Sequence, residues 1–368
     1  MKLEKVNLYH LRMPLVSPFE TSFGRSTDRE CILIEGIGDG IHAWGECVAD
    51  RDPGYAYETT GTAWHILQEF IIQLVIGEEI AKPMDVQDRL SAIRGHPMAK
   101  AGIEMCLWDL WGKQENLSLQ KLLGGSGSKV NVGVSIGIQA SPEKLVEVAG
   151  DYLSNGYRRI KIKIKPGRDV LDTQAVRLAF PKIMLQVDAN SAYTLDSAAV
   201  LAPLDDLQLL LIEQPLAEDD LWDHSLLQKQ FKTPLCLDES ILSERHARQA
   251  LEMKACRIIN IKAGRVGGLS QAVAIHNLCR QQAVPVWCGG MLETGVGRAA
   301  NLALASLPGF SLPGDISATD RYYQQDIIEE SFVLNADSTI DVPQGSGLGI
   351  HVDSQALERF TLARQSFP

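Results

Sequence analysis

The chain has 368 residues, of which 45% are hydrophobic and 22% are charged, and its formal net charge is −11. These proportions are typical of a globular protein, and no apolar run approaches the ~18 residues that a membrane span needs. The negative charge and the lack of long basic runs argue against nucleic acid and anionic membranes as partners. Seven isolated cysteines indicate reduced thiols, and the start of the chain lacks a secretory core, so we expect a cytoplasmic protein.

The first 125 residues mix strand patterns with helical ones. Residues 31–36 and 41–47 predict two strands joined by a Gly-Asp-Gly turn. Residues 57–76 and 98–113 have apolar side chains at helical spacing.

Between residues 126 and 325, short β-branched runs alternate with helical patterns, such as those over 142–153 and 269–282. Eight strands with seven intervening helical segments predict a parallel α/β barrel. The tail, 326–368, is too short to fold alone, and we expect it to return to the first stretch. The predicted strands are 130–136, 159–164, 184–187, 209–212, 235–237, 257–261, 284–287 and 310–312.

Five polar residues end five successive predicted strands. They are Lys163, Asp188, Glu213, Asp238 and Lys262, and the steps between them are 25, 25, 25 and 24 residues. Because this step is about one strand-helix unit, each residue should recur at the same height on the next strand round the barrel. The C-terminal ends of barrel strands hold the chemistry. The spacing therefore predicts three adjacent carboxylates with a lysine at each flank.

Three carboxylates close together repel one another in a low-dielectric cleft, and a divalent cation relieves that repulsion. Oxygen ligands without a histidine or cysteine cluster favour Mg²⁺ or Mn²⁺ over Zn²⁺. We therefore expect Asp188, Glu213 and Asp238 to be metal ligands. The alternative is that they are unrelated acidic residues at the starts of loops.

The second predicted strand alternates lysine with isoleucine. With a period of two, Lys161 and Lys163 share one face, which should point into the barrel, and Asn260 and Lys262 repeat the pattern on the sixth strand. The alternative is an exposed strand with a charged outer face. Lys165, at the strand exit, is expected to be solvated.

A lysine can remove the weakly acidic hydrogen next to a carboxylate only if its pKa falls toward neutrality. Burial and nearby cations lower it, and Lys161 and Arg265 are the candidate cations for Lys163 and Lys262. Two lysines on opposite sides of the metal ligands could remove a proton from one face and return it to the other. The products would be a racemised acid or, with a β-leaving group, a dehydrated one.

Segments 161–163, 188–190, 213–215, 238–240 and 260–262 read KIK, DAN, EQP, DES and NIK. In combination they resemble the muconate-lactonising-enzyme subgroup of the enolase superfamily, and the resemblance covers nearly the whole chain.

Within that subgroup the chain is most similar to the o-succinylbenzoate synthase and N-succinylamino acid racemase type. The similarity lies in segments 18–24, 44–47, 210–216, 264–268 and 287–295.

The resemblance implies a (β/α)7β modified TIM barrel over residues 126–325. It implies an α+β capping domain formed by residues 1–125 and the returning tail, 326–368. It also implies one Mg²⁺, with Mn²⁺ as a substitute, and Lys163 and Lys262 as acid and base.

Loops near residues 21–23 and Tyr55 are implied to close over a small carboxylate substrate. The alternatives are that Phe23 and Tyr55 only pack on the barrel, that Ser135 caps a loop, and that Arg265 is a surface residue. The expected substrate-binding or supporting residues are Lys161, Asn190, Ser135, Phe23, Tyr55, Arg265, Glu239, Gly290 and Met291.

The resemblance implies dehydration of 2-succinyl-6-hydroxy-2,4-cyclohexadiene-1-carboxylate in menaquinone biosynthesis, and racemisation of N-succinyl or other N-acyl amino acids. Arg265 favours the racemase. Alternatives in the subgroup are muconate cycloisomerase and dipeptide epimerase, although residues 315–317 lack the Asp-x-Asp motif of the epimerases. Residues 287–289 also lack the histidine of mandelate racemases.

Two other classes stay open at this point. One is a metal-independent Schiff-base lyase, and the other is a non-catalytic metabolite-binding barrel. Whichever class holds, we expect a homo-oligomer.

Overall fold

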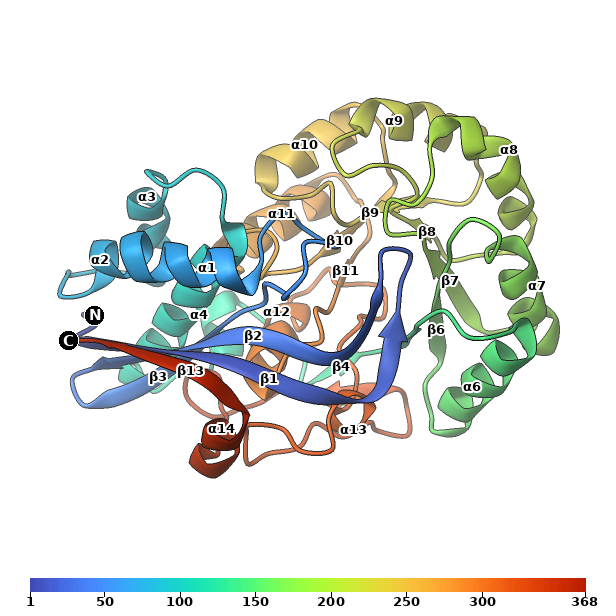
Figure 1. Cartoon of the computed structure of the whole chain (residues 1–368). Helices are drawn as coiled ribbons and strands as arrows, with labels where there is room; N and C mark the ends of the chain where they lie inside the picture. The colour runs from blue at the N-terminus through green and yellow to red at the C-terminus, as the bar shows by residue number, and fades with distance from the viewer.

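The longest strand of the chain is one that the sequence patterns did not predict. In the computed structural model, which describes residues 1–368, β1 (Lys5–Glu20) pairs antiparallel with β2 (Arg25–Gly38). β2 pairs with β3 (Ile41–Cys47) in turn, and β13 (Thr361–Phe367) pairs with the other edge of β1. The tail therefore joins the sheet that the first residues begin, and Figure 1 shows the two chain ends close together.

The helices of the first stretch cover one face of this sheet. The predicted helix over 98–113 is confirmed as α4 (Pro97–Gln114), which packs against β3 with most of its residues buried. Gly45 and Gly102 allow that contact, because a Cβ on Gly45 would lie 2.1 Å from the Gly102 carbonyl oxygen. The other segments here are α1 (Thr60–Ile66), the π-helical turn η1 (Leu67–Ile71), α2 (Ile72–Val75), η2 (Pro83–Asp85), α3 (Val86–Leu90) and α5 (Leu119–Leu123).

A parallel sheet of seven strands, in chain order, forms the wall of the barrel and confirms the predicted fold class. Its buried apolar side chains belong to the largest core cluster of the protein. The strands are β5 (Val134–Ile136), β6 (Arg159–Lys163), β7 (Met184–Asp188), β8 (Ile212–Glu213), β9 (Leu235–Leu237), β10 (Ile258–Ile261) and β11 (Val286–Cys288).

Helices surround this wall on the outside, as Figure 1 shows. The helices predicted over 142–153 and 269–282 are confirmed as α6 (Pro142–Ser154) and α11 (Leu269–Gln281). The segments between strands are α6 (Pro142–Ser154), α7 (Val170–Ala179), η3 (Leu195–Ser197), α8 (Ala198–Leu201), η4 (Ala202–Asp206), α9 (Leu221–Gln230), α10 (Glu244–Glu252), α11 (Leu269–Gln281) and α12 (Gly295–Ala305).

The prediction of an eighth strand over residues 310–312 is wrong. The barrel closes there through two isolated bridges, from Val286 to Phe310 and from Val132 to Gly314. Proline cannot donate a ladder hydrogen bond, and Pro313 interrupts this segment. The buried Arg159 guanidinium donates to the carbonyl oxygens of Pro313 and Gly314 and so holds the gap together.

The first predicted strand, over 130–136, divides in two. β4 (Lys129–Asn131) pairs antiparallel with β12 (Thr339–Asp341) of the tail, and only β5 enters the barrel. The tail also contains α13 (Thr319–Tyr322) and α14 (Ser354–Phe360). All seven cysteines are buried and unpaired, and no helix has the length and apolarity needed to span a bilayer.

Two buried carboxylates join the antiparallel sheet unit to the barrel. Glu46 of β3 accepts hydrogen bonds from the Thr294 hydroxyl at 2.6 Å and the Gly297 amide at 2.9 Å, at the start of α12. Glu104 of α4 accepts from the Leu269 amide at 2.6 Å, at the start of α11. The first N–H groups of a helix lack intrahelical partners, so each carboxylate satisfies groups that would otherwise be orphaned.

The Glu46 contact predicts a pH-dependent stability. Burial raises the pKa of Glu46 from 4.5 to about 7. Its contribution to stability is therefore full below about pH 4.5 and is lost as the pH rises through about 7, a loss on the order of 3 kcal/mol. Urea unfolding at about pH 5 and about pH 8 should show a loss in Glu46→Gln that is smaller than the wild-type loss by about this amount. A part of the loss remains in both proteins, because other buried carboxyl groups such as Glu58 also have a raised pKa. An equal loss in Glu46→Gln would contradict the assignment, and exposed Glu69→Gln serves as the control.

Candidate active site

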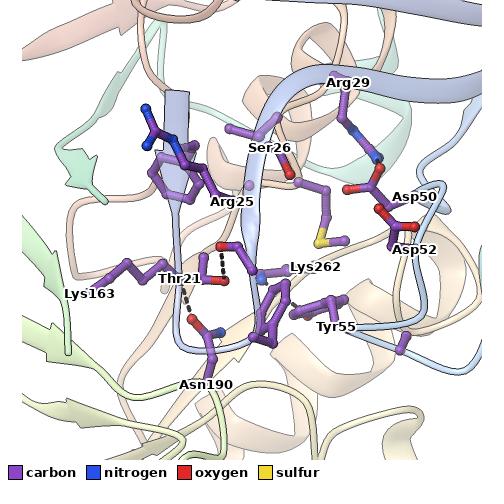
Figure 2. A pocket seen from close by; sticks show the side chains of 18 of the residues that line it. Thr21, Arg25, Ser26, Arg29, Asp50, Asp52, Tyr55, Lys163, Asn190 and Lys262 are labelled. Atoms are coloured by element: carbon purple, nitrogen blue, oxygen red, sulfur yellow. Dashed lines mark hydrogen bonds and ion pairs between the residues drawn. The ribbon is translucent and has the colours of Figure 1, made fainter. Parts of the chain in front are cut away.

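A cavity of about 380 Å³ lies between the β1–β2 hairpin and the C-terminal ends of the barrel strands. Lys163, at the end of β6, and Lys262, one residue past β10, both line it. Figure 2 shows the two lysines approaching from different strands, with Tyr55 beside Lys262 and Asn190 beside Lys163. The cavity therefore joins residues from the barrel and from the first 125 residues.

The three carboxylates predicted as ligands do not line the cavity themselves, but two of them contact the lysines that do. Asp188 and Glu213 end β7 and β8 and are direct partners in the parallel ladder, and Asp238 follows β9. Each is at most 1% exposed. The even spacing in the sequence thus corresponds to side chains on adjacent strands.

Both cavity lysines form ion pairs with these carboxylates. Lys163 Nζ lies 2.6 Å from Asp188 Oδ2 and donates to Asn190 Oδ1 at 2.7 Å. Lys262 Nζ lies 2.7 Å from Asp238 Oδ2. Each lysine is therefore held against a different carboxylate of the cluster, and both lysines line the cavity.

A second layer of charges lies deeper in the barrel. Lys161 Nζ is 2.9 Å from Glu213, 3.0 Å from Asp188 and 2.6 Å from Asp315, and Asp315 also pairs with Arg159 at 2.7 Å. Asp315 and Arg159 were not among the predicted site residues. Arg159 could have been predicted, because the period-two alternation that turns Lys161 into the barrel also turns Arg159 inward. No local sequence pattern indicates Asp315.

The two cavity lysines have opposite pKa shifts. Burial lowers the pKa of Lys163, and the Lys161 charge acts in the same direction while Asp188 opposes it. Burial also acts to lower the pKa of Lys262, but Tyr55 and Glu213 outweigh it, and the pKa is raised. Lys163 is thus the better base of the two, as expected from its cationic neighbour.

Lys262 does not have the lowered pKa that was expected with Arg265 as its cationic neighbour. Arg265 is fully buried, forms an ion pair with Asp238, and donates to the carbonyl oxygens of Ile241 at 2.8 Å and Asn260 at 2.7 Å. It does not line the cavity. Its contacts fix the position of a carboxylate, because the guanidinium offers several donors in one plane.

Glu239 is a buried carboxylate with only one of its two oxygens hydrogen-bonded. Asn190 donates to its Oε1 at 2.8 Å, whereas its Oε2 has no hydrogen-bond partner. Burial and the charge of Asp188 raise the pKa of Glu239 to about 7. An orphaned oxygen at this depth is available to a ligand that brings a hydrogen-bond donor or a cation.

Of the predicted substrate contacts, Phe23, Tyr55, Asn190, Gly290 and Met291 line the cavity. The Tyr55 hydroxyl donates to Asp238 at 3.0 Å and accepts from Lys262 at 3.1 Å, so this loop reaches the cluster itself. Ser135 does not line the cavity; it is buried, and its hydroxyl has no partner. Cavity residues that were not predicted include Phe19, Arg25, Arg29 and Met98.

The three predicted ligands do not converge on one point in a way that could hold a metal ion. Their oxygens face Lys161, Lys163, Lys262 and Arg265 instead. The donor set nevertheless fits Mg²⁺ by its chemistry, because all three groups are carboxylates on adjacent strands. The orphaned Glu239 oxygen supports the same fit.

Comparison with known proteins agrees with this geometry. The family model for the mandelate racemase / muconate lactonizing enzyme N-terminal domain matches residues 4–124, and that for an enolase C-terminal domain-like region matches 144–356. The chain is 49% identical to o-succinylbenzoate synthase of Geobacillus kaustophilus, over 98% of this chain and 96% of that protein. It is 46% identical to N-succinylamino acid racemase of Thermus thermophilus, over 98% of each. A crystal structure of an enolase superfamily member from Listeria innocua matches with a TM-score of 0.96 and 42% identity, over 100% of this chain and 99% of that one.

The deeper charge layer predicts that Lys161 is essential for stability. Lys161→Met would leave Glu213, Asp188 and Asp315 without their shared cation, which should cost about 3–5 kcal/mol of unfolding free energy. The control is Lys165→Met. Its lysine is 37% exposed and pairs with Glu20 at 3.0 Å, so a loss below about 1 kcal/mol is expected. Urea unfolding measures both losses. If Lys161→Met loses as little unfolding free energy as Lys165→Met, the buried ion pairs of Lys161 do not stabilise the protein.

Proposed function

The chain belongs to the enolase superfamily, in its mandelate racemase and muconate lactonizing enzyme group, and from this we propose that it is a Mg²⁺-dependent enzyme with two activities. It dehydrates 2-succinyl-6-hydroxy-2,4-cyclohexadiene-1-carboxylate to o-succinylbenzoate, and it racemises N-succinyl amino acids. The observation that supports this most directly is that Lys163 and Lys262 line one cavity from separate strands, β6 and β10.

In racemisation, one lysine takes the proton on the carbon next to the substrate carboxylate, and the electron pair moves onto that carboxylate to form an enediolate. The other lysine, as an ammonium, returns a proton to the opposite face of the same carbon. Because its pKa is lowered, Lys163 is the better base, whereas Lys262 favours the protonated state. Exchange of roles between the two lysines gives the reverse reaction.

Dehydration begins with the same proton removal. The electron pair left on carbon 1 then forms the ring double bond as the hydroxyl group on carbon 6 leaves, and a proton from a lysine ammonium converts it to water. The ring becomes aromatic, which favours the forward direction. Both activities therefore require the same pair of lysines and differ in the fate of the enediolate.

Enolase superfamily members use Mg²⁺ with a lysine or histidine base. We propose Asp188, Glu213 and Asp238 as its ligands here, with Glu239 and Arg265 supporting them. A bound Mg²⁺ would neutralise the substrate carboxylate and so lower the cost of the second negative charge. Its charge would also lower the pKa of both lysines.

The alternatives within the subgroup, muconate cycloisomerase and dipeptide epimerase, are less favoured, because full-length relatives at 45–49% identity are synthases and racemases of succinylated compounds. No contact in the cavity favours a Schiff-base lyase over these activities. Assembly into a homo-oligomer stays a prediction.

The two-lysine proposal predicts distinct effects for single variants. Lys163→Ala and Lys262→Ala should each lower N-succinyl amino acid racemisation by about 10³-fold or more. In D₂O each variant should still exchange the α-hydrogen of one enantiomer only, because one lysine remains on one face. Proton NMR of each enantiomer measures the exchange. Lys229→Ala, an exposed lysine of α9, is the control, and wild-type racemisation by either cavity variant would disprove the assignment.

The metal proposal predicts loss of both activities after chelation and dialysis, with recovery on addition of Mg²⁺ or Mn²⁺. Mg²⁺ should also raise the thermal midpoint of the wild type, since a ligand that binds only the folded state stabilises it. Glu213→Gln should abolish that rise. Full activity in chelated enzyme, with a substrate adduct trapped by borohydride, would instead support the Schiff-base alternative.

A further inference from the structure

A second cavity, of about 620 Å³, lies on the other side of β1 from the catalytic one. The end of β1 separates the two: Phe19 and Thr21 line the catalytic cavity, and Pro18 and Glu20 line the second. This division follows from the alternation of side chains along a strand. We call the second space the rim cavity, because its other walls are α6 and the loops that follow β5 and β6.

The β1 wall is tied to the barrel rim at one point. The amide of Ile138 donates to the Glu20 carbonyl oxygen at 2.9 Å. Gly137 allows this approach, because a Cβ there would lie 2.7 Å from the Glu20 nitrogen. The rim cavity therefore has a defined wall on the side of the active site.

The rim cavity concentrates positive charge in a protein whose net charge is −11. Three of its cations have carboxylate partners: Lys165 with Glu20 at 3.0 Å, Arg168 with Asp172 at 2.8 Å, and Lys144 with Glu147 at 2.7 Å. Glu20 is the only carboxylate among the lining residues. The cations of the lining are Arg25, Lys144, Lys165, Arg168 and Arg321.

Arg25 and Arg321 form no ion pair. The Arg25 side chain projects from the hairpin and makes none of the interactions drawn in Figure 2. Arg321 is only 9% exposed, and its Nε has no hydrogen-bond partner. Its remaining contacts are a hydrogen bond from Nη2 to the Ser135 carbonyl oxygen at 2.8 Å and cation–π contacts with the rings of Phe19, Tyr152 and Tyr322.

A buried guanidinium without a counter-charge is costly, so the arrangement calls for an anion. Arg321 is the buried cation, and the exposed Arg25 supplies a second positive charge, so together they match an anion with two negative charges.

We propose that the rim cavity binds a small dianion, either a dicarboxylate or a phosphate, with Arg321 and Arg25 as its principal contacts. Arg321 lines the rim cavity and not the catalytic one, whereas Arg25 lines both, so the two sites meet at Arg25. Its occupant would lie against the opposite face of the strand segment that supplies Phe19 and Thr21 to the active site.

The test is calorimetric titration of the full-length protein with inorganic phosphate and, separately, with succinate at low ionic strength. Arg321→Gln should weaken binding about tenfold or more, the value of one lost charge-assisted hydrogen bond. Lys165→Gln removes an exposed charge of the same cavity and should also weaken binding, which keeps the test informative if the buried variant folds poorly. The anion that binds more tightly identifies the class of ligand.

Two control variants establish whether the anion binds in the rim cavity or elsewhere on the protein. Lys229→Gln removes the same charge on α9 and should leave binding unchanged. Lys262→Ala should also leave it unchanged, since Lys262 lines only the catalytic cavity. The proposal is overturned if neither anion binds at millimolar concentration, or if Lys229→Gln weakens binding as much as the rim variants. It is equally overturned if Lys262→Ala abolishes binding while the rim variants retain it.

Discussion

The interior of the barrel depends on the mutual compensation of buried charges. A single buried carboxylate or ammonium is very costly, and a pair is tolerated only when each member has partners in good geometry. Here Lys161 is shared by three carboxylates, and Asp238 is shared by Lys262 and Arg265. Because Lys161, Asp188, Asp238 and Asp315 each have more than one charged partner, removing one of them leaves other buried charges without full compensation.

This compensation also sets the properties of the proposed acid and base. Lys161 keeps its proton, because Asp315 and Glu213 raise its pKa against the effect of burial. Asp315, for its part, has a pKa lowered to about 2, since Lys161 and Arg159 outweigh its burial. A permanent positive charge is therefore fixed beside Lys163. The charges deep in the barrel therefore stabilise the fold and also set the pKa of the lysine that lines the cavity.

Much of this could be predicted from the sequence, because it depends on local periods. The alternation around Lys163 gave its orientation, and the step of about 25 residues placed Asp188 and Glu213 on neighbouring strands. Features that depend on contacts across the chain could not be predicted. They include the pairing of β1 with β13, the closure of the barrel by bridges, and the position of Arg265 beneath Asp238. The role of Asp315 also lay outside any local pattern, since its partners are about 150 residues away.

The pairing of β1 with β13 has a consequence for how the protein is made. β1 leaves the ribosome well before β13, its partner in the sheet, with Val6 opposite Phe367. Until β13 has emerged, one edge of β1 has no partner, and an unpaired strand edge can associate with other chains. The strands of the barrel emerge before β13, so the barrel can form before the antiparallel sheet is completed. Chaperone dependence during biosynthesis would therefore be concentrated in the sheet rather than in the barrel.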